Sequence, residues 1–214
     1  MGHLLEAYLE TLEKKDFFPK VIIDYLEEME TILKKKRFIH TCGVVKMSKM
    51  LANHYCADEL VVMTAAALHD YAKHESPQAL LAYAQKNGLL VDEVMATSTE
   101  LLHGYVGSRM IKEKFNISDE QVLGAIAYHT IGRANMSLSE QIVYLADAIE
   151  PSRDYKGVQM LRDLAYKDLE KAILVCVSST LRYVIEKGIL VHPNSLMLYN
   201  EMILKHGKPE FEVE

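Results

Sequence analysis

The sequence predicts an all-α fold in a single domain, because helical periodicity is nearly continuous and strand alternation is weak. Apolar residues between 18 and 33 recur at i, i+3 and i+4 without a break, which is the spacing of one helix face. The only stretch that suggests a strand is the short GILVHP, residues 188–193. A chain of 214 residues, half of them hydrophobic, is large enough to bury one well-packed core.

The next helices are marked by their ends. We expect one helix over residues 37–55 and another over residues 58–70, the latter containing the apolar run LVVMTAAA. Ser76 followed by Pro77 is typical of a helix start, with the serine as N-cap and the proline in the first helical position. Gly88 is expected to end that helix, since glycine readily takes the left-handed conformation found after helix C-termini.

The second half of the chain carries similar signals. SDEQ (118–121) and SLSE (137–140) both match the capping box, in which a serine and a Glu or Gln three residues later bond each other's backbone N–H groups. A long helix is predicted over residues 168–187, closed by Gly188. The pattern therefore predicts a helical extension at 1–17, one main domain at 18–205 and a tail at 206–214.

The composition disfavours several classes of function. The formal net charge of −6 argues against a nucleic-acid-binding protein, which needs a basic surface. The three cysteines include no CxxC pair, and no signal peptide is visible, so a cytoplasmic protein is expected. The apolar run at 60–68 is shorter than the roughly 18 residues that a membrane helix needs, so no membrane association is expected.

Four of the nine histidines stand in short distinctive stretches, and an aspartate emerges from an apolar helix. The residues are His40 in RFIHTCGV, His69 followed by Asp70 in LHDYAK, His103 in ELLHGYVGS, His129 in AYHTIGR, and Asp147 in VYLADAIEP. A single histidine beside an apolar stripe is more often a hydrogen-bonded core residue than a metal ligand. The adjacent pair His69-Asp70 argues against that interpretation, because neighbouring helical side chains diverge by about 100° and can hold an ion between them.

The chemistry of this residue set favours a transition metal. Imidazole and carboxylate groups together suit Fe, Mn, Co or Zn. Four histidines and two aspartates supply enough ligands for two ions. Two cations close together lower the pKa of a bridging water to about neutrality, which produces a hydroxide that can attack phosphorus.

These motifs resemble a known family. His40, the HD pair at 69–70 and Asp147 reproduce the H…HD…D signature of HD-domain metallohydrolases. The surrounding stretches RFIHTCGV, LHDYAK, AIAYHTIGR and IVYLADAIEPSR resemble the bacterial YqeK-like branch, over roughly residues 20–200. Members of that branch are all-helical, carry a two-metal centre that is typically iron, and hydrolyse diadenosine tetraphosphate symmetrically to two ADP.

The resemblance also implies roles for individual residues. It assigns the first ion to the signature residues and the second ion to the two further histidines: His40, His69, Asp70 and Asp147 for the first, His103 and His129 for the second. Asp70 is expected to be the bridging carboxylate and a catalytic residue. The implied cofactors are two iron ions, with Mn, Co and Zn as alternatives.

Five residues are predicted to act on substrate. Lys73 lies four residues after His69, on the same face if the helix continues, and is expected to act in catalysis by neutralising substrate phosphate; a solvated lysine is an equal alternative. Arg133 and Arg153 follow ligand motifs in loops, where arginine suits bidentate phosphate contacts. Thr130 and Gly132 would let the backbone approach the ligand closely.

Three further features remain open. Glu150 could orient a metal-binding histidine, or it could be a plain acid at a helix C-terminus. The run KKKR (34–37) is expected to be a solvated helix face rather than a substrate funnel. Tyrosines near the ligands could stack on a purine, although most are expected in the core: Tyr71, Tyr105, Tyr128 and Tyr144.

The sequence therefore predicts a metal-dependent phosphoanhydride hydrolase acting on a dinucleoside polyphosphate. One alternative is a different reaction of the same centre, on a nucleoside monophosphate or a phosphodiester. A second alternative is a non-catalytic nucleotide-sensing protein that keeps its metals for stability. A homodimer is an open option.

Overall fold

A computed structural model describes residues 2–12 and 17–209, and the expectation of an all-α fold is confirmed: within these ranges every regular element is a helix. The α-helices of the first half are α1 (His3–Glu10), α2 (Lys20–Ile32), α3 (Lys35–Tyr55), α4 (Glu59–Leu68), α5 (Pro77–Lys86), α6 (Glu93–Thr97) and α7 (Leu102–Lys114). Those of the second half are α8 (Glu120–Tyr128), α9 (Leu138–Ile149), α10 (Val158–Lys167), α11 (Leu169–Glu186) and α12 (Pro193–His206). Two short 3₁₀ helices, η1 (Tyr71–His74) and η2 (Thr99–Leu101), interrupt the first half.

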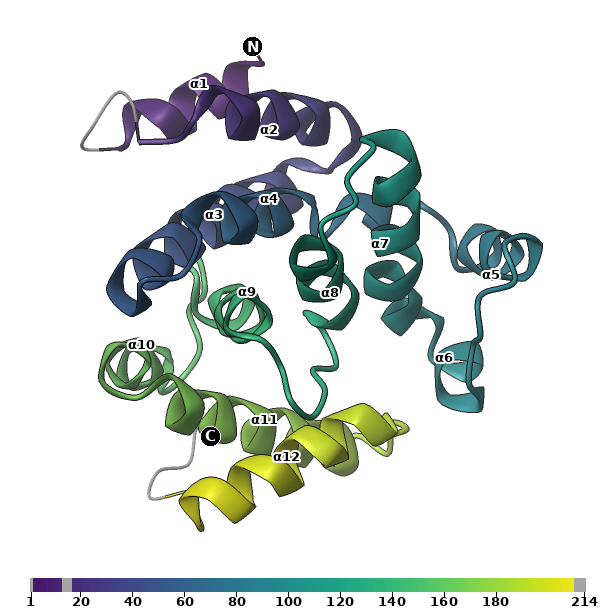
Figure 1. The fold of residues 1–214 in the computed structure, drawn as a ribbon, viewed down its shortest axis with the longest axis vertical. Coiled ribbons are helices and arrows are strands. Elements are labelled where there is room, and N and C mark those ends of the chain that lie inside the picture. The colour runs from purple at the N-terminus through teal and green to yellow at the C-terminus, as the bar shows by residue number, and fades with distance from the viewer. Residues whose placement is uncertain (1, 13–16, 210–214) are drawn as a thin grey trace.

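Helix α9 lies in the middle of the bundle and organises it (Figure 1). It packs against α3, α4, α8, α10 and α11. Its residues are largely buried, and Ile142, Val143, Leu145 and Ala146 are completely so. Asp147 lies near the C-terminus of this helix, and its side chain is 23% exposed.

The helix boundaries largely follow the predicted capping signals. The side chain of Ser76 caps α5 by accepting from the backbone N–H of Ala79, with Pro77 in the first turn. Ser137 and Glu140 form the predicted capping box of α9. The segment 188–193 contains no strand, because α11 ends at Glu186 and α12 begins at Pro193.

The predicted capping box at 118–121 is wrong. The N-cap of α8 is Asp119, one residue later, and its carboxylate accepts from the backbone N–H groups of Gln121 and Val122. An aspartate at the N-cap also places a negative charge at the positive end of the helix dipole. That interaction explains why Asp119, and not Ser118, is the N-cap.

The segment after α4 also differs from a continuous helix. The α-helix ends at Leu68, and the chain tightens into η1, where the N–H of Lys73 bonds the carbonyl of Asp70. The 3₁₀ helix has a different twist from an α-helix, so the predicted shared face of His69 and Lys73 does not follow from α-helical spacing.

The N-terminal helix packs on the main body. Figure 1 shows α1 beside α2, and Leu5 of α1 is fully buried. The carboxylate of Glu30 on α2 accepts from the backbone N–H of Leu4 at 2.9 Å, so it satisfies one of the free donors at the start of α1. Residues 13–16 of the predicted extension and 210–214 of the predicted tail lie outside the described residues. The domain limits at 17/18 and 205/206 stay a prediction.

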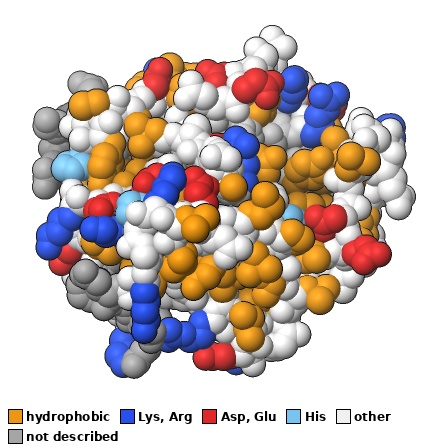
Figure 2. All heavy atoms as spheres, turned by 60° about the horizontal axis from the view of Figure 1, so that its bottom comes forward, with side chains coloured by type: hydrophobic (Ala, Val, Ile, Leu, Met, Phe, Trp, Pro, Cys, Tyr) orange, Lys and Arg blue, Asp and Glu red, His pale blue; other side chains and the backbone are white. Residues whose placement is uncertain are grey.

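A smaller apolar cluster holds α5 and α6 against α7. It consists of Ala72, Leu80, Ala84, Met95, Leu102, Val106 and Ile131. On the outside, hydrophobic side chains cover much of the face that carries α11 and α12 (Figure 2). Among the described residues, no helix combines the length and the hydropathy that crossing a membrane requires.

The corrected cap of α8 can be tested directly. Substituting Asp119→Ala is expected to lower the free energy of unfolding by about 1 kcal/mol, because two backbone N–H groups lose their acceptor. Ser118→Ala should change it by less than about 0.5 kcal/mol. Chemical denaturation of both variants measures the difference. A larger loss of unfolding free energy in Ser118→Ala than in Asp119→Ala would instead support the capping box predicted at residues 118–121.

Candidate metal centre

The structure brings all six predicted ligands together, although they come from five separate elements. They are His40 on α3, His69 and Asp70 just after α4, His103 in the first turn of α7, His129 just after α8, and Asp147 on α9. The four histidines and Asp70 are buried. Three of the six, His69, Asp70 and His129, follow the last residue of a helix, so the local end of the helix turns their side chains toward the centre.

Each of the four histidines has its Nδ1 engaged by a fixed oxygen. The partners are Glu150 for His40 at 3.0 Å, Ala66 O for His69 at 2.7 Å, Glu100 O for His103 at 2.6 Å, and Ile126 O for His129 at 2.7 Å. Carbonyl and carboxylate oxygens can only accept, so each Nδ1 must carry the proton. In the neutral ring the Nε2 lone pair is then free to bind a cation.

The Nε2 lone pairs of these four histidines lack sufficient hydrogen-bond donors among the described residues. The Nε2 atom of His69 is buried without a hydrogen-bond partner, and that of His40 faces a carboxylate oxygen of Asp147 at 2.9 Å while the His40 Nδ1 proton is bonded to Glu150. The Nε2 atoms of His103 and His129 lie 3.0 Å apart, and two lone pairs at that distance repel each other unless a cation lies between or beside them. Thr130 Oγ1, at 3.0 and 3.2 Å, can donate to one of the two but not to both. This arrangement fits a metal centre.

Asp70 occupies the centre of the cluster, with its two carboxylate oxygens facing different pairs of histidines. Oδ2 lies 3.3 Å from His69 Nε2 and 3.9 Å from His40 Nε2. Oδ1 lies 3.4 Å from His103 Nε2 and 4.0 Å from His129 Nε2. The carboxylate therefore divides the histidines into two half-sites.

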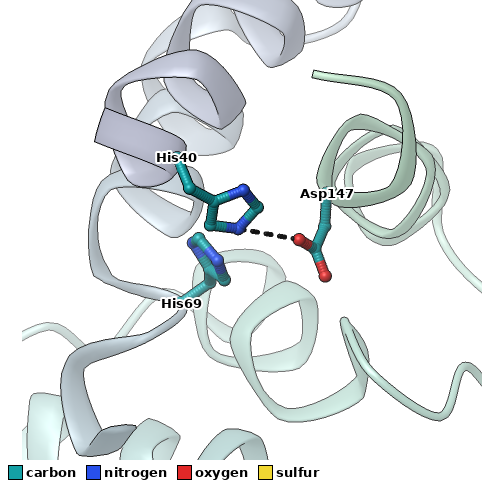
Figure 3. Close-up of side chains that lie close together, drawn as sticks. All are labelled: His40, His69 and Asp147. Carbon is teal, nitrogen blue, oxygen red and sulfur yellow. Dashed lines mark ion pairs between the residues drawn. The ribbon is translucent and has the colours of Figure 1, made fainter. Parts of the chain in front are cut away.

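Asp147 completes the half-site of His40 and His69. Figure 3 shows its carboxylate pointing at the two imidazole rings, and Oδ1 lies 2.9 Å from His40 Nε2. The ligand atoms of His40, His69 and Asp147 all lie within 4.8 Å of one another, and the same holds for His69, Asp70 and His129. Both groups have the dimensions of a metal site.

The protonation states suit metal binding as well. Burial, together with the nearby imidazoles, lowers the pKa of His129 to about 4, and burial lowers the pKa of His103 well below its usual value. Burial alone would raise the pKa of Asp70 and of Asp147, but the surrounding histidines hold the pKa of both below the usual range. At neutral pH His103 and His129 are thus neutral, and Asp70 and Asp147 are ionised, the forms that bind metals.

The contacts of Glu150 favour the first of its two predicted roles, the orientation of a metal-binding histidine. Glu150 is fully buried, bonds His40 Nδ1, and accepts from the backbone N–H and hydroxyl of Ser152. A Cβ atom on Gly43 would collide with its carboxylate, so the glycine leaves the space that Glu150 occupies. Such partners fix the ring orientation and the tautomer of a ligand.

The five predicted substrate residues lie at varying positions around the cluster. Arg153 donates to Asp147 Oδ1 at 2.8 Å, so it borders the ligands directly. Lys73 belongs to η1 and is exposed overall. Partial burial of its ammonium group lowers its pKa, and the negative charge of Asp70 partly offsets this effect. Thr130 contacts His103 and His129.

Arg133 and Gly132 have structural partners. The guanidinium of Arg133 donates to both carboxylate oxygens of the buried Glu140 and lies over the ring of Tyr128. Gly132 has a φ of +64°, and a Cβ there would collide with Leu198 of α12. The positive φ and this close packing account for the glycine without any ligand.

Arg37 is a charged neighbour of the centre that was not predicted from the sequence. Arg37 Nη1 donates to Asp70 Oδ2 at 2.9 Å, so the expectation of a solvated helix face for residues 34–37 is wrong at this position. The spacing could have indicated this position, because Arg37 stands three residues before His40 and lies on the same face of the helix.

A cavity of about 570 Å³ opens beside the ligands. Its wall includes His129 and Asp147 together with three tyrosines, Tyr144, Tyr155 and Tyr183. Only Tyr144 was among the tyrosines considered from the sequence. Tyr155 comes from the loop after α9, eight residues beyond Asp147, and Tyr183 comes from α11, far from any ligand motif along the chain.

The role of Glu150 yields a prediction. Glu150→Ala is expected to weaken metal affinity by about 10- to 100-fold, since His40 loses the acceptor that fixes its ring. Metal titration with an indicator dye measures the affinity, and circular dichroism checks the helical content. The control Glu186→Ala removes an exposed acid and should change neither. Unaltered metal affinity in Glu150→Ala would contradict the assigned role.

Comparison with known proteins identifies the family. Residues 37–152 match the HD domain. The chain is 36% identical to the symmetrical bis(5'-nucleosyl)-tetraphosphatase of Halalkalibacterium halodurans, covering 84% of this chain and 96% of that protein. It is 35% identical to the protein of the same name from Bacillus subtilis, covering 80% and 91% of the two chains.

A solved structure is also similar. The crystal structure of an HD superfamily hydrolase of Clostridium acetobutylicum, described as involved in NAD metabolism, matches with a TM-score of 0.82 and 38% identity. The match covers 87% of this chain and 97% of that one. These similarities confirm the resemblance drawn from the motifs, and the chain belongs to the HD-domain family.

Proposed function

We propose that the protein is a metal-dependent hydrolase that cleaves diadenosine tetraphosphate symmetrically to two ADP. The observation that carries the proposal is the position of Asp70, whose two oxygens face two pairs of histidines with their Nε2 lone pairs turned inward. The relatives over most of the chain are named symmetrical bis(5'-nucleosyl)-tetraphosphatases. Chemistry and relatives support the same reaction class.

The centre is proposed to hold two ions, with Asp70 bridging them. His40, His69 and Asp147 would hold one ion, and His103 and His129 the other. Iron is the proposed metal, with Mn, Co and Zn as alternatives that the same ligands accept. When bound, such ions supply positive charge at phosphorus and a water nucleophile at neutral pH.

The residues around the ligands would bind and neutralise the phosphate chain. Arg153 and Lys73 are proposed to neutralise phosphate charge, and Thr130 to hold a phosphate oxygen through its hydroxyl. Gly132 and Arg133 remain proposed substrate contacts of the adjoining loop, although the bonds of Arg133 to Glu140 favour a structural role. The leaving group is a nucleoside diphosphate, so the reaction needs little general-acid assistance.

The cavity beside the ligands is proposed to bind the retained adenosine. Its tyrosines, Tyr144, Tyr155 and Tyr183, offer aromatic faces suited to a purine. If the base is held there and the ions act on the second phosphate, the attacked phosphorus is fixed relative to the base. The central anhydride of the tetraphosphate is then the bond that breaks.

This geometry predicts the products. Diadenosine tetraphosphate should give ADP alone, and diadenosine pentaphosphate should give ADP plus ATP, as measured by chromatography of the reaction mixture. AMP as a principal product of the tetraphosphate would place the ions one phosphate closer to the ribose and refute the assignment. Equal turnover of ordinary nucleoside monophosphates or phosphodiesters would favour another reaction of the same centre. No turnover with any added metal would favour a nucleotide sensor.

A further inference from the structure

A second cavity also borders the metal ligands. It measures about 630 Å³ and is lined by His40 and by four basic residues, Lys34, Lys36, Arg37 and Arg153; we call it the basic groove. The first cavity reaches the centre through His129 and Asp147, whereas the basic groove reaches it through His40. Arg153 and Tyr155 border both cavities. The two cavities therefore reach different members of the ligand cluster.

The two cavities differ in chemistry. The first is lined mainly by apolar and aromatic groups, which suit a base. In the basic groove, Lys34 and Lys36 are exposed and form no ion pair with any described residue. Arg37 and Arg153 are anchored at its inner end by Asp70 and Asp147. Four cations in one groove suit a chain of phosphates.

The acidic groups in the basic groove do not cancel this charge. Glu150 also lines it, but its carboxylate is fully buried and bonded to His40 and Ser152. Asp154 is the other acid along the lining. The groove thus keeps a net positive charge, and Lys34 and Lys36 are its two exposed lysines.

We propose that the basic groove binds the departing half of a dinucleoside polyphosphate, with Lys34 and Lys36 contacting its phosphates. The inference rests on the proposed function and extends it to substrate choice. A substrate split at its central anhydride needs space on both sides of the attacked phosphorus, and these two cavities provide it. A nucleoside monophosphate fills only the first cavity and gains nothing from the groove, so the lysines select for long phosphate chains.

The test compares the Lys34→Ala/Lys36→Ala double variant with the wild type and with Lys35→Ala. Lys35 belongs to the same basic run but does not line the groove, so Lys35→Ala controls for the loss of one positive charge from this run. KM and kcat are measured for diadenosine tetraphosphate, and the affinity of the metal-loaded protein for AMP is measured by calorimetry. Metal content and helical content are checked in each protein.

The double variant should raise KM for the tetraphosphate about tenfold, with kcat and AMP affinity changed by less than about twofold. Lys35→Ala should behave as the wild type. An unchanged KM in the double variant would overturn the inference, and so would an equal loss of AMP affinity, which would indicate a general electrostatic effect. Failure of the proposed function is distinguishable, because the wild type would then release no ADP from the tetraphosphate.

Discussion

A buried carboxylate with histidines on both of its oxygens is the interaction on which the rest of the centre depends. Asp70 is almost completely buried, and an isolated charge at that depth would be strongly destabilising. Four imidazoles surround it, and Arg37 donates to one of its oxygens. Since the Nε2 atoms offer lone pairs rather than protons, the carboxylate and the imidazoles need cations between them. The cluster is thus arranged for metal ions.

The fold serves this requirement by ending helices at the centre. His69 and His129 are each the first residue beyond a helix, and their rings bond a carbonyl three residues earlier in that helix. His103 makes the same kind of bond near the start of α7. Backbone carbonyls that would otherwise lack partners at a helix end therefore fix three of the four tautomers. Only His40, in the middle of a helix whose carbonyls are occupied, needs a side chain, Glu150, for this role.

Much of this arrangement could be predicted from the sequence, because metal ligands need particular residue types in a particular order. The all-α fold and the cap of α5 follow from local patterns, whereas His103 and His129 are predicted as ligands only through the resemblance to the HD-domain family. The error at the start of α8 arose because Ser118 and Asp119 are both good caps, and only the observed hydrogen bonds distinguish them. Arg37 was missed because a run of four basic residues is usually solvated, and its bond to Asp70 spans 33 residues.

The substrate cavities were the least predictable feature. Tyr183 reaches the first cavity only because α11 packs against α9, a long-range contact that no sequence motif indicates. Arg133 was predicted to contact substrate because it follows a ligand motif in a loop. Its guanidinium instead bonds the buried Glu140 on the next helix. Tertiary packing decides both outcomes, so only the three-dimensional arrangement separates residues that face substrate from those that hold the scaffold.

Anomalous diffraction from crystals of the metal-loaded protein tests the central claim most directly. The account predicts two anomalous peaks, one beside each oxygen of Asp70, with every histidine ligand bound through Nε2. A peak bound through Nδ1 of any of the four histidines, or metal positions that do not contact Asp70, would contradict it.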